Sequence, residues 1–166
     1  MVRGTFLGRE MSQSEGEILF WERFLTRTNF KRIIELGTYK GHFSFYLYLY
    51  CIQNKKEFYT YDNLDWKSFD KRAHLKNKLN FDKCFKKADI FEIKKEIGEI
   101  IQRQGTTIVF CDNGNKPKEL KTFTLYLKKD DIIVSHDYGT EVQKTDIPNG
   151  LEIITMSQDS IFLKKV

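Results

Sequence analysis

Short apolar runs alternate with longer helical patterns along most of the chain. Helical patterns separate the first five runs, whereas the last two follow one another across the turn "MSQDSIF". Strands joined through a helix pair in parallel, and strands joined by a short turn pair antiparallel. The expected strands are Arg32–Leu36, Phe58–Tyr61, Cys84–Ala88, Thr107–Cys111, Asp131–Ser135, Leu151–Met156 and Ser160–Lys165.

The helical patterns have the periodicity needed for packing against a sheet. The segment Gly41–Gln53 is apolar nearly all round, as in a buried helix. Apolar residues recur on one face of each of the others, which are Trp66–Leu79, Glu92–Arg103 and Lys116–Lys128.

A further helix is expected before the first strand. The stretch "SQSEGE" holds two overlapping capping boxes, Ser12-x-x-Glu15 and Ser14-x-x-Glu17, which predict a helix that runs to about Arg27. Together the elements predict an α/β fold. We expect a Rossmann-like, doubly wound sheet of seven strands, mostly parallel with an antiparallel C-terminal hairpin strand, and helices on both faces.

The composition limits the class of protein. With 40% hydrophobic residues, 166 residues suffice for one folded domain. No apolar run reaches the length of a membrane span, and the N-terminal stretch does not resemble a signal peptide. Three cysteines without disulfide or zinc spacing fit a reducing compartment, so we expect a cytoplasmic protein without membrane contact. The net charge of +5 could attract an acidic partner, but it also fits a lysine-rich solvated surface.

A carboxylate stands at the end of each of the first five strands. These residues are Glu35, Asp62, Asp89, Asp112 and Asp137. Ligands of doubly wound sheets bind outside the carboxyl ends of the strands, so the five carboxylates are candidates for a binding site. The alternative for each is a structural role, because Asp also caps helices and makes turns.

The first strand leads into the pattern Gly37-x-x-x-Gly41, which allows a tight turn and a close approach of backbone to a ligand. The spacing differs from the dinucleotide pattern G-x-G-x-x-G, and Tyr39 stands inside it, so a pyrophosphate cradle is disfavoured. Asp62 ends the next strand, where a carboxylate accepts both hydroxyls of a ribose. A nucleoside without a pyrophosphate fits these features best.

Two stretches of the chain carry a family resemblance. "IELGTYKGHFS" resembles motif I of class I S-adenosylmethionine-dependent methyltransferases, in the form found in small-molecule O-methyltransferases such as the catechol O-methyltransferase group. "FCDNGNKPKELKTFTLYLKKDDIIVSHDYG" resembles the fourth- and fifth-strand region of the cephalosporin hydroxylase-like and methyltransferase 24 families. The match runs over roughly Lys31 to Glu141. It implies one class I methyltransferase-like domain over residues 1–166, with an N-terminal helix at 1–30, a cofactor-binding core at 31–141 and a C-terminal hairpin at 142–166.

The resemblance implies a set of contacts with S-adenosylmethionine. Motif I would shape the pocket for the methionine end, Asp62 would bind the ribose hydroxyls, and Ala88 and Asp89 would border the adenine. Asp112 would stand beside the methionine. The implied cofactor-binding residues are Glu35, Gly37, Thr38, Tyr39, Gly41, Asp62, Asn63, Ala88, Asp89 and Asp112.

The resemblance also implies a centre for catalysis at the fourth and fifth strands. Metal-dependent relatives would hold Mg²⁺ or Mn²⁺ with Asp112 and two residues of the fifth strand, here His136 and Asp137. A histidine is unusual for Mg²⁺, which prefers oxygen, so it favours Mn²⁺, Fe²⁺ or Zn²⁺, a catalytic base, or a site without metal. Lys116 or His136 could remove the proton of an acceptor hydroxyl. The catalytic candidates are therefore His136, Lys116 and Asp112.

The expected reaction is O-methylation of a hydroxyl on an acceptor, most simply a small molecule. Little sequence remains for a lid, which leaves an open site for a large acceptor, a site completed by a second subunit in a homodimer, or a small acceptor bound by loops. The loops Asn63–Trp66 and Tyr138–Gly150 are then the specificity elements.

Three other functions are alternatives to this reading of the sequence. A nucleotide-dependent oxidoreductase would need a third glycine in the first turn, which is absent. A non-catalytic S-adenosylmethionine-binding subunit would tolerate loss of cofactor residues, yet these are present. Nucleic-acid methylation at base amines would need an N/D-P-P-Y/F motif where "DNGNK" stands, so only ribose methylation remains.

Overall fold

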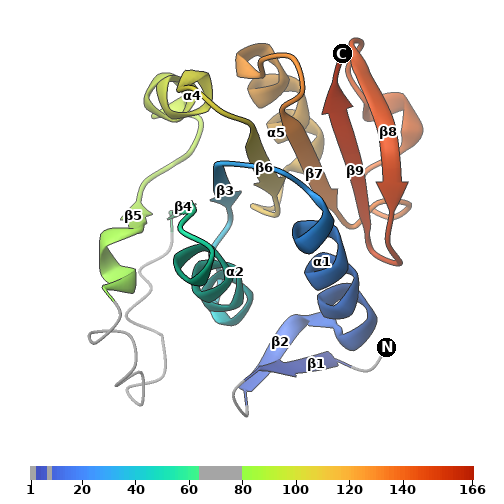
Figure 1. Cartoon of the computed structure of the whole chain (residues 1–166). Helices are drawn as coiled ribbons and strands as arrows, with labels where there is room; N and C mark the ends of the chain where they lie inside the picture. Colours follow the sequence, from blue (N-terminus) through green and yellow to red (C-terminus); the bar gives the residue numbers. More distant parts are fainter. Residues whose placement is uncertain (1–2, 7–8, 64–79) are drawn as a thin grey trace.

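A computed structural model of the chain describes residues 3–6, 9–63 and 80–166 (Figure 1). Within these residues, seven strands form one sheet in the order β5-β4-β3-β6-β7-β9-β8. The predicted strands and the predicted fold are confirmed, with ends that differ by at most two residues. The strands are β3 (Arg32–Leu36), β4 (Glu57–Asp62), β5 (Phe85–Lys87), β6 (Thr107–Cys111), β7 (Ile132–His136), β8 (Leu151–Met156) and β9 (Ser160–Lys165).

The pairing of the strands brings their carboxyl ends together. The strands β5, β4, β3, β6 and β7 pair in parallel, and β9 is antiparallel to both β7 and β8. The chain leaves β3 toward β4 and later returns to the other side of β3 through β6, so the strand order reverses there. Ligands of such sheets bind at this reversal, outside the carboxyl ends, which point downward in Figure 1.

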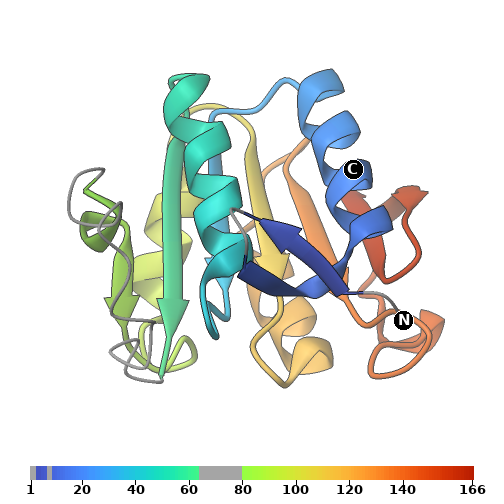
Figure 2. The same cartoon turned by 90° about the horizontal axis from the view of Figure 1, so that it is seen from below.

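Helices cover both faces of the sheet (Figure 2). The helices α1 (Glu15–Arg27) and α2 (His42–Gln53) pack on one face, and α4 (Lys94–Gln102) and α5 (Lys116–Phe123) pack on the other. Neighbouring residues of a strand enter opposite cores, as Ile33 and Ile34 do. The parallel strands therefore read as continuous apolar runs.

One helix is shorter than predicted, and another predicted helix is not tested. The helix α5 ends at Phe123 and continues as a 3₁₀ turn at Thr124–Tyr126 rather than as one helix to Lys128. The predicted helix Trp66–Leu79 lies outside the described residues. Short 3₁₀ helices also occur at Phe81–Lys83 and Lys144–Asp146. In the described part of the chain, no helix is both long enough and apolar enough to cross a membrane.

The N-terminal region is more than the expected helix. The side chain of Ser14 accepts a hydrogen bond from the Glu17 amide at 3.2 Å and caps α1, as the second capping box predicts. Before it, β1 (Arg3–Phe6) and β2 (Arg9–Ser14) form an antiparallel hairpin. The expectation of a helix alone at residues 1–30 is thus wrong for this hairpin. It gives little signal because a polar residue, Gln13, alternates with Met11 on its buried side.

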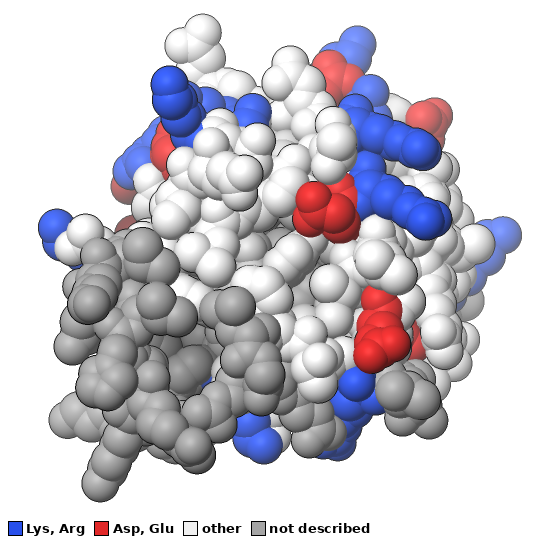
Figure 3. Space-filling model, turned by 60° about the horizontal axis from the view of Figure 1, so that its bottom comes forward, with Lys and Arg blue, Asp and Glu red and all other residues white. Residues whose placement is uncertain are grey.

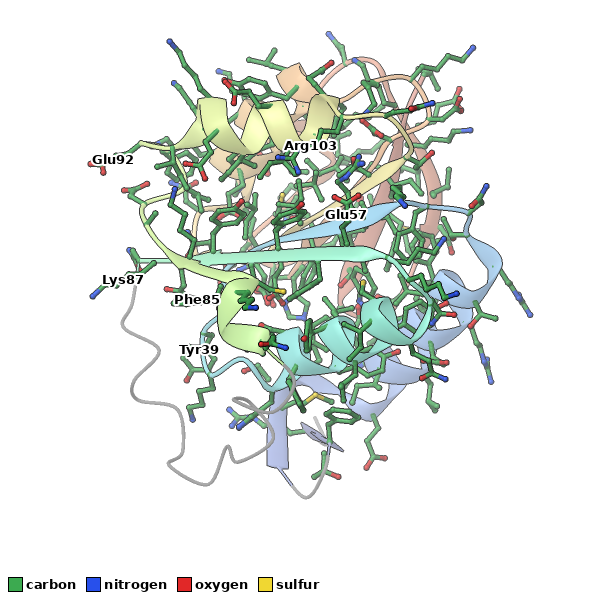
Figure 4. The ribbon with its side chains drawn as sticks, turned by 60° about the vertical axis from the view of Figure 1, so that its left-hand side comes forward. Tyr39, Glu57, Phe85, Lys87, Glu92 and Arg103 are labelled. Atoms are coloured by element: carbon green, nitrogen blue, oxygen red, sulfur yellow. The ribbon has the colours of Figure 1, made fainter. Side chains whose placement is uncertain are left out.

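At the amino end of the sheet, one buried arginine forms hydrogen bonds to several neighbouring segments. The Arg32 guanidinium donates to the backbone carbonyls of Arg103, Gln104 and Gly105, to Thr107 Oγ1 and to Glu57. Figure 4 shows Glu57 and Arg103 together at one end of β4, while Tyr39 and Lys87 lie toward its other end. Arg32 therefore ties the starts of three neighbouring elements together, far from the edge where ligands are expected.

Candidate functional site

A cavity of about 590 Å³ lies at the carboxyl edge of the sheet. This end of the molecule comes forward in Figure 3, where acidic side chains stand near the middle of the view and most basic ones toward its margin. The cavity brings together most residues that the sequence singled out. Those that line it are Glu35, Gly37, Thr38, Tyr39, Gly41, Asp62, Asn63, Asp112, Lys116, His136 and Asp137.

The turn after β3 has a backbone that only glycine fits without strain. Gly37 has φ +103°, and a Cβ on it would lie 2.3 Å from the carbonyl oxygen of Asp112. Gly41 has φ +69° and begins α2. Tyr39 also has a positive φ, of 46°, and its amide donates to Asp62 Oδ2 at 2.7 Å. The turn after β3 is therefore pressed against the end of β6 and tied to the end of β4.

Glu35 is buried at the floor of the cavity. Thr60 Oγ1 donates to its carboxyl group at 2.6 Å, and Thr38 Oγ1 lies 2.6 Å from Thr60 Oγ1. Burial raises the pKa of Glu35 to about 8, against an ordinary value of 4.5. The sequence singled out Glu35 and Thr38 but not Thr60, which the strand pattern alone does not distinguish from a packing residue.

The two residues expected at the adenine do not line the cavity. Ala88 donates its amide to the carbonyl of Asp62 at 2.8 Å. Asp89 is exposed, and its Oδ1 accepts from the Phe91 amide at 2.8 Å. That bond is the turn-forming role left open as the alternative for Asp89.

A cluster of charged groups lines the cavity at the ends of β6 and β7. Lys116 Nζ lies 2.9 Å from Asp137 Oδ2, 2.9 Å from Glu141 Oε2 and 3.5 Å from Asp112 Oδ1. Burial alone would lower the pKa of Lys116, but the bonds to Asp137 and Glu141 raise it well above its ordinary value. Burial also raises the pKa of Asp112 to about 6. Lys116 is therefore an ammonium ion held by three carboxyl groups.

His136 stands beside this cluster, with Nδ1 toward two carboxylates and Nε2 without a partner among the described residues. It is 9% exposed, and among the described residues neither ring nitrogen has a hydrogen-bond partner. Nδ1 lies 3.1 Å from Asp137 Oδ1 and 3.6 Å from Asp112 Oδ1. The ring meets Phe110 edge-on, with centroids 6.4 Å apart. A buried imidazole with unpaired nitrogens is costly, which is typical of a group that a ligand completes.

Asp112, His136 and Asp137 are spaced like metal ligands. One donor atom from each lies within 4.8 Å of the others. The same two carboxylates, however, hold the Lys116 ammonium. A divalent ion between them would face this like charge at close range. As arranged, these residues do not fit a divalent metal ion.

Sequence reasoning missed several residues of the site, among them Gln13 and Glu141. Gln13, from the N-terminal hairpin, is 3% exposed and donates Nε2 to Asp112 Oδ2 at 3.3 Å, while its Oε1 has no hydrogen-bond partner among the described residues. No pattern in "REMSQS" marks it. Glu141 lies in the segment Tyr138–Gly150, which was predicted to govern specificity, but its pairing with Lys116 depends on a turn that the sequence does not specify.

No family model matches the chain, and no curated protein is similar to it in sequence. Solved structures do resemble it. A structure of CmcI with S-adenosylhomocysteine is 13% identical, with a TM-score of 0.64 over 98% of this chain and 81% of that one. A Staphylococcus aureus protein described as a caffeoyl-CoA O-methyltransferase is 12% identical, with a TM-score of 0.63 over 90% and 83%.

An S-adenosylmethionine-dependent O-methyltransferase from Thermotoga maritima is 14% identical, with a TM-score of 0.59 over 96% of this chain and 68% of that one. These structural neighbours are S-adenosylmethionine-dependent methyltransferases, as the resemblance of the two sequence stretches predicted. At such identities the likeness concerns the fold alone. The chain has the Rossmann-like fold of class I methyltransferases.

Proposed function

We propose that the protein is an S-adenosylmethionine-dependent O-methyltransferase that acts on a hydroxyl group of a small molecule. The observation that carries this proposal is the composition of the single cavity described above. The glycine turn after β3 and Asp62 line this cavity, and so does the His136 imidazole, which lies beside carboxylates and whose Nε2 has no partner among the described residues. Residues suited to binding the cofactor and a residue suited to accepting a proton thus line the same cavity.

The glycine turn and Asp62 suit the cofactor. In this proposal the cofactor approaches the backbone of the turn at Gly37, and Asp62, which lines the cavity, binds two ribose hydroxyls. When bound there, S-adenosylmethionine supplies a methyl group on a sulfonium. The task of the protein is then to hold the acceptor oxygen in line with that methyl group and to take its proton.

We assign the proton acceptor to His136 rather than to Lys116. Lys116 keeps its proton because it is bound to Asp137 and Glu141. In His136, a hydrogen on Nδ1 faces the carboxylates of Asp137 and Asp112, which leaves the lone pair of Nε2 for the acceptor hydroxyl. The same carboxylates stabilise the imidazolium ion that forms when the proton arrives.

The charge near His136 favours a small acceptor over nucleic acid. Asp112, Asp137 and Glu141 outnumber Lys116 there, so the phosphates of an RNA strand would meet net negative charge. A non-catalytic cofactor-binding subunit is the other alternative, and the unpaired imidazole argues against it.

The first test is calorimetric titration with S-adenosylhomocysteine. We expect one site in the wild-type protein. Asp62→Ala should weaken binding by about 10- to 100-fold, because charge-assisted hydrogen bonds contribute roughly 1.5–3 kcal/mol. Glu152→Ala, an exposed carboxylate on the edge strand β8, should leave the affinity unchanged. Absence of binding by the folded wild-type protein would contradict the cofactor assignment.

The second test is transfer of a labelled methyl group to a panel of phenols, catechols and hydroxy acids. His136→Asn should lower turnover by about 10²- to 10⁴-fold, the usual contribution of a general base, and leave S-adenosylhomocysteine binding unchanged. Cofactor binding without transfer to any hydroxyl would support the non-catalytic subunit. Transfer to an RNA ribose instead would support the nucleic-acid alternative.

A further inference from the structure

We infer that the ammonium group of Lys116 serves as the cation of the carboxylate cluster at the ends of β6 and β7, so that the site functions without a divalent metal ion. The inference deepens the proposed function and rests on it for the statement about methyl transfer. The statement about cation binding rests on the cluster alone.

The geometry of Lys116 is that of a bound cation. The side chain is 5% exposed, and Nζ lies within 3.5 Å of carboxylate oxygens from Asp112, Asp137 and Glu141. An ammonium has three hydrogens to donate, and three carboxylates surround it, one after β6 and two in the turn after β7. The position between Asp112 and Asp137 that would suit a metal is therefore neutralised by the protein itself.

The placement of Lys116 at a helix start supports the same conclusion. Lys116 is the first residue of α5, where Asn115 caps the helix by accepting from the Lys118 amide. The amino end of a helix carries a partial positive charge, which disfavours a cation there. The carboxylates are what make this position favourable for Lys116, so the lysine and the carboxylates depend on one another.

A metal ion would have to displace the lysine. The donor atoms of Asp112, His136 and Asp137 lie within 4.8 Å of one another, close enough to share one ion. Two of these three groups are the ones that bind Nζ. Removing the ammonium without removing the carboxylates should therefore uncover a metal site that the wild-type protein lacks.

Lys116 also has a positioning role toward the proposed base. Asp137 binds Lys116 through Oδ2 and faces His136 through Oδ1. The ammonium thereby fixes the carboxylate that holds the imidazole. Loss of Lys116 should lower the rate of turnover, because the Asp137 carboxylate then lacks the cation that fixes it beside His136.

The test is Mn²⁺ binding, measured as loss of the electron paramagnetic resonance signal of free Mn²⁺. The samples are wild type, Lys116→Met, Lys116→Met with Asp137→Asn, and Lys121→Met as an exposed lysine of the same helix. We expect Lys116→Met to bind Mn²⁺ at least tenfold more tightly than wild type and Lys121→Met. Asp137→Asn should remove this gain.

Two results of the Mn²⁺ measurement would overturn the inference. One is tight Mn²⁺ binding by the wild-type protein that Asp112→Asn abolishes, a measurement that does not depend on the folding of Lys116→Met. The other is folded Lys116→Met that binds Mn²⁺ no better than wild type. Loss of wild-type methyl transfer on treatment with a chelator would likewise overturn the metal-free mechanism. S-adenosylhomocysteine binding by the same samples tests the proposed function separately.

Discussion

The two ends of the sheet use buried charge in opposite ways. At the amino end, all the nitrogens of the Arg32 guanidinium donate hydrogen bonds, and Glu57 accepts from Arg32 and Tyr59. At the carboxyl end, His136 has two nitrogens without partners among the described residues, and the carboxyl group of Glu35 titrates far from its ordinary range. At the amino end the buried polar groups find their partners within the chain, whereas at the carboxyl end some of them do not.

This difference separates stability from function. Buried polar groups of a native protein are almost always paired, so a group left unpaired calls for an explanation such as a missing ligand. Perturbed pKa values gather at functional sites for the same reason. In this molecule a buried group without a partner and a perturbed pKa both occur at the edge where a doubly wound sheet binds ligands. Changes at the amino end should therefore alter folding, and changes at the carboxyl end should alter binding and titration.

Arg32→Met should have the largest effect of the variants considered. It leaves Thr107 and three backbone carbonyls without their donor, and breaking a buried charge network costs about 3–5 kcal/mol of unfolding free energy. Urea denaturation measures this loss. Arg103→Met, whose side chain is half exposed, should cost less than about 1 kcal/mol. Equal losses in the two variants would contradict the conclusion that the hydrogen bonds of Arg32 stabilise the amino end of the sheet.

The sheet was predictable from the sequence because each strand of its core faces helices on both sides. Continuous apolar runs such as Thr107–Cys111 follow from that burial and are visible without a structure. The capping pair Ser14 and Glu17 was equally local. These features depend on neighbours in sequence, which is why they could be read in advance.

The site was predictable only in its position at the strand ends. The carboxylates Asp62 and Asp112 were found because they follow apolar runs. The contact of Gln13 with Asp112 joins residues 99 positions apart through a polar hairpin, and no pattern marks such a contact. The pairing of Lys116 with Glu141 likewise appears only once β6 and β7 lie side by side.

Gly37→Ala should have an intermediate effect. Its Cβ would lie within 2.8 Å of three backbone atoms of Asp112 and Asn113, and backbone cannot move aside as a side chain does. We expect a loss of about 2–3 kcal/mol, measured by urea denaturation, together with weaker S-adenosylhomocysteine binding. Gly114→Ala is the matched control, with a positive φ but no atom within 4 Å of the added Cβ, and should cost about 1 kcal/mol.

The measurement that contrasts the two ends most directly is the pH dependence of stability in Glu35→Gln and Glu57→Gln. Burial raises the pKa of Glu35 to about 8, so between pH 4.5 and 8 the folded protein binds a proton that the unfolded chain has released. Stability should fall as pH rises through this window, by at most about 1.4 kcal/mol per pH unit. Glu35→Gln, which cannot ionise, should reduce that slope, and the raised pKa values of Asp112 and Glu119 account for the part that remains.

Glu57 should behave with the opposite sign. Burial alone would raise its pKa, but hydrogen bonds from Tyr59 and Arg32 lower it below the ordinary value of 4.5. Its contribution to stability is present above that value and is lost as pH falls through the lowered pKa. Glu57→Gln should therefore leave the slope between pH 4.5 and 8 unchanged and alter stability only in acid. Urea denaturation at pH 4, 6, 7 and 8 measures both variants. Identical slopes for Glu35→Gln and wild type would contradict the assignment of Glu35 as a protonated carboxyl group that lines the cavity.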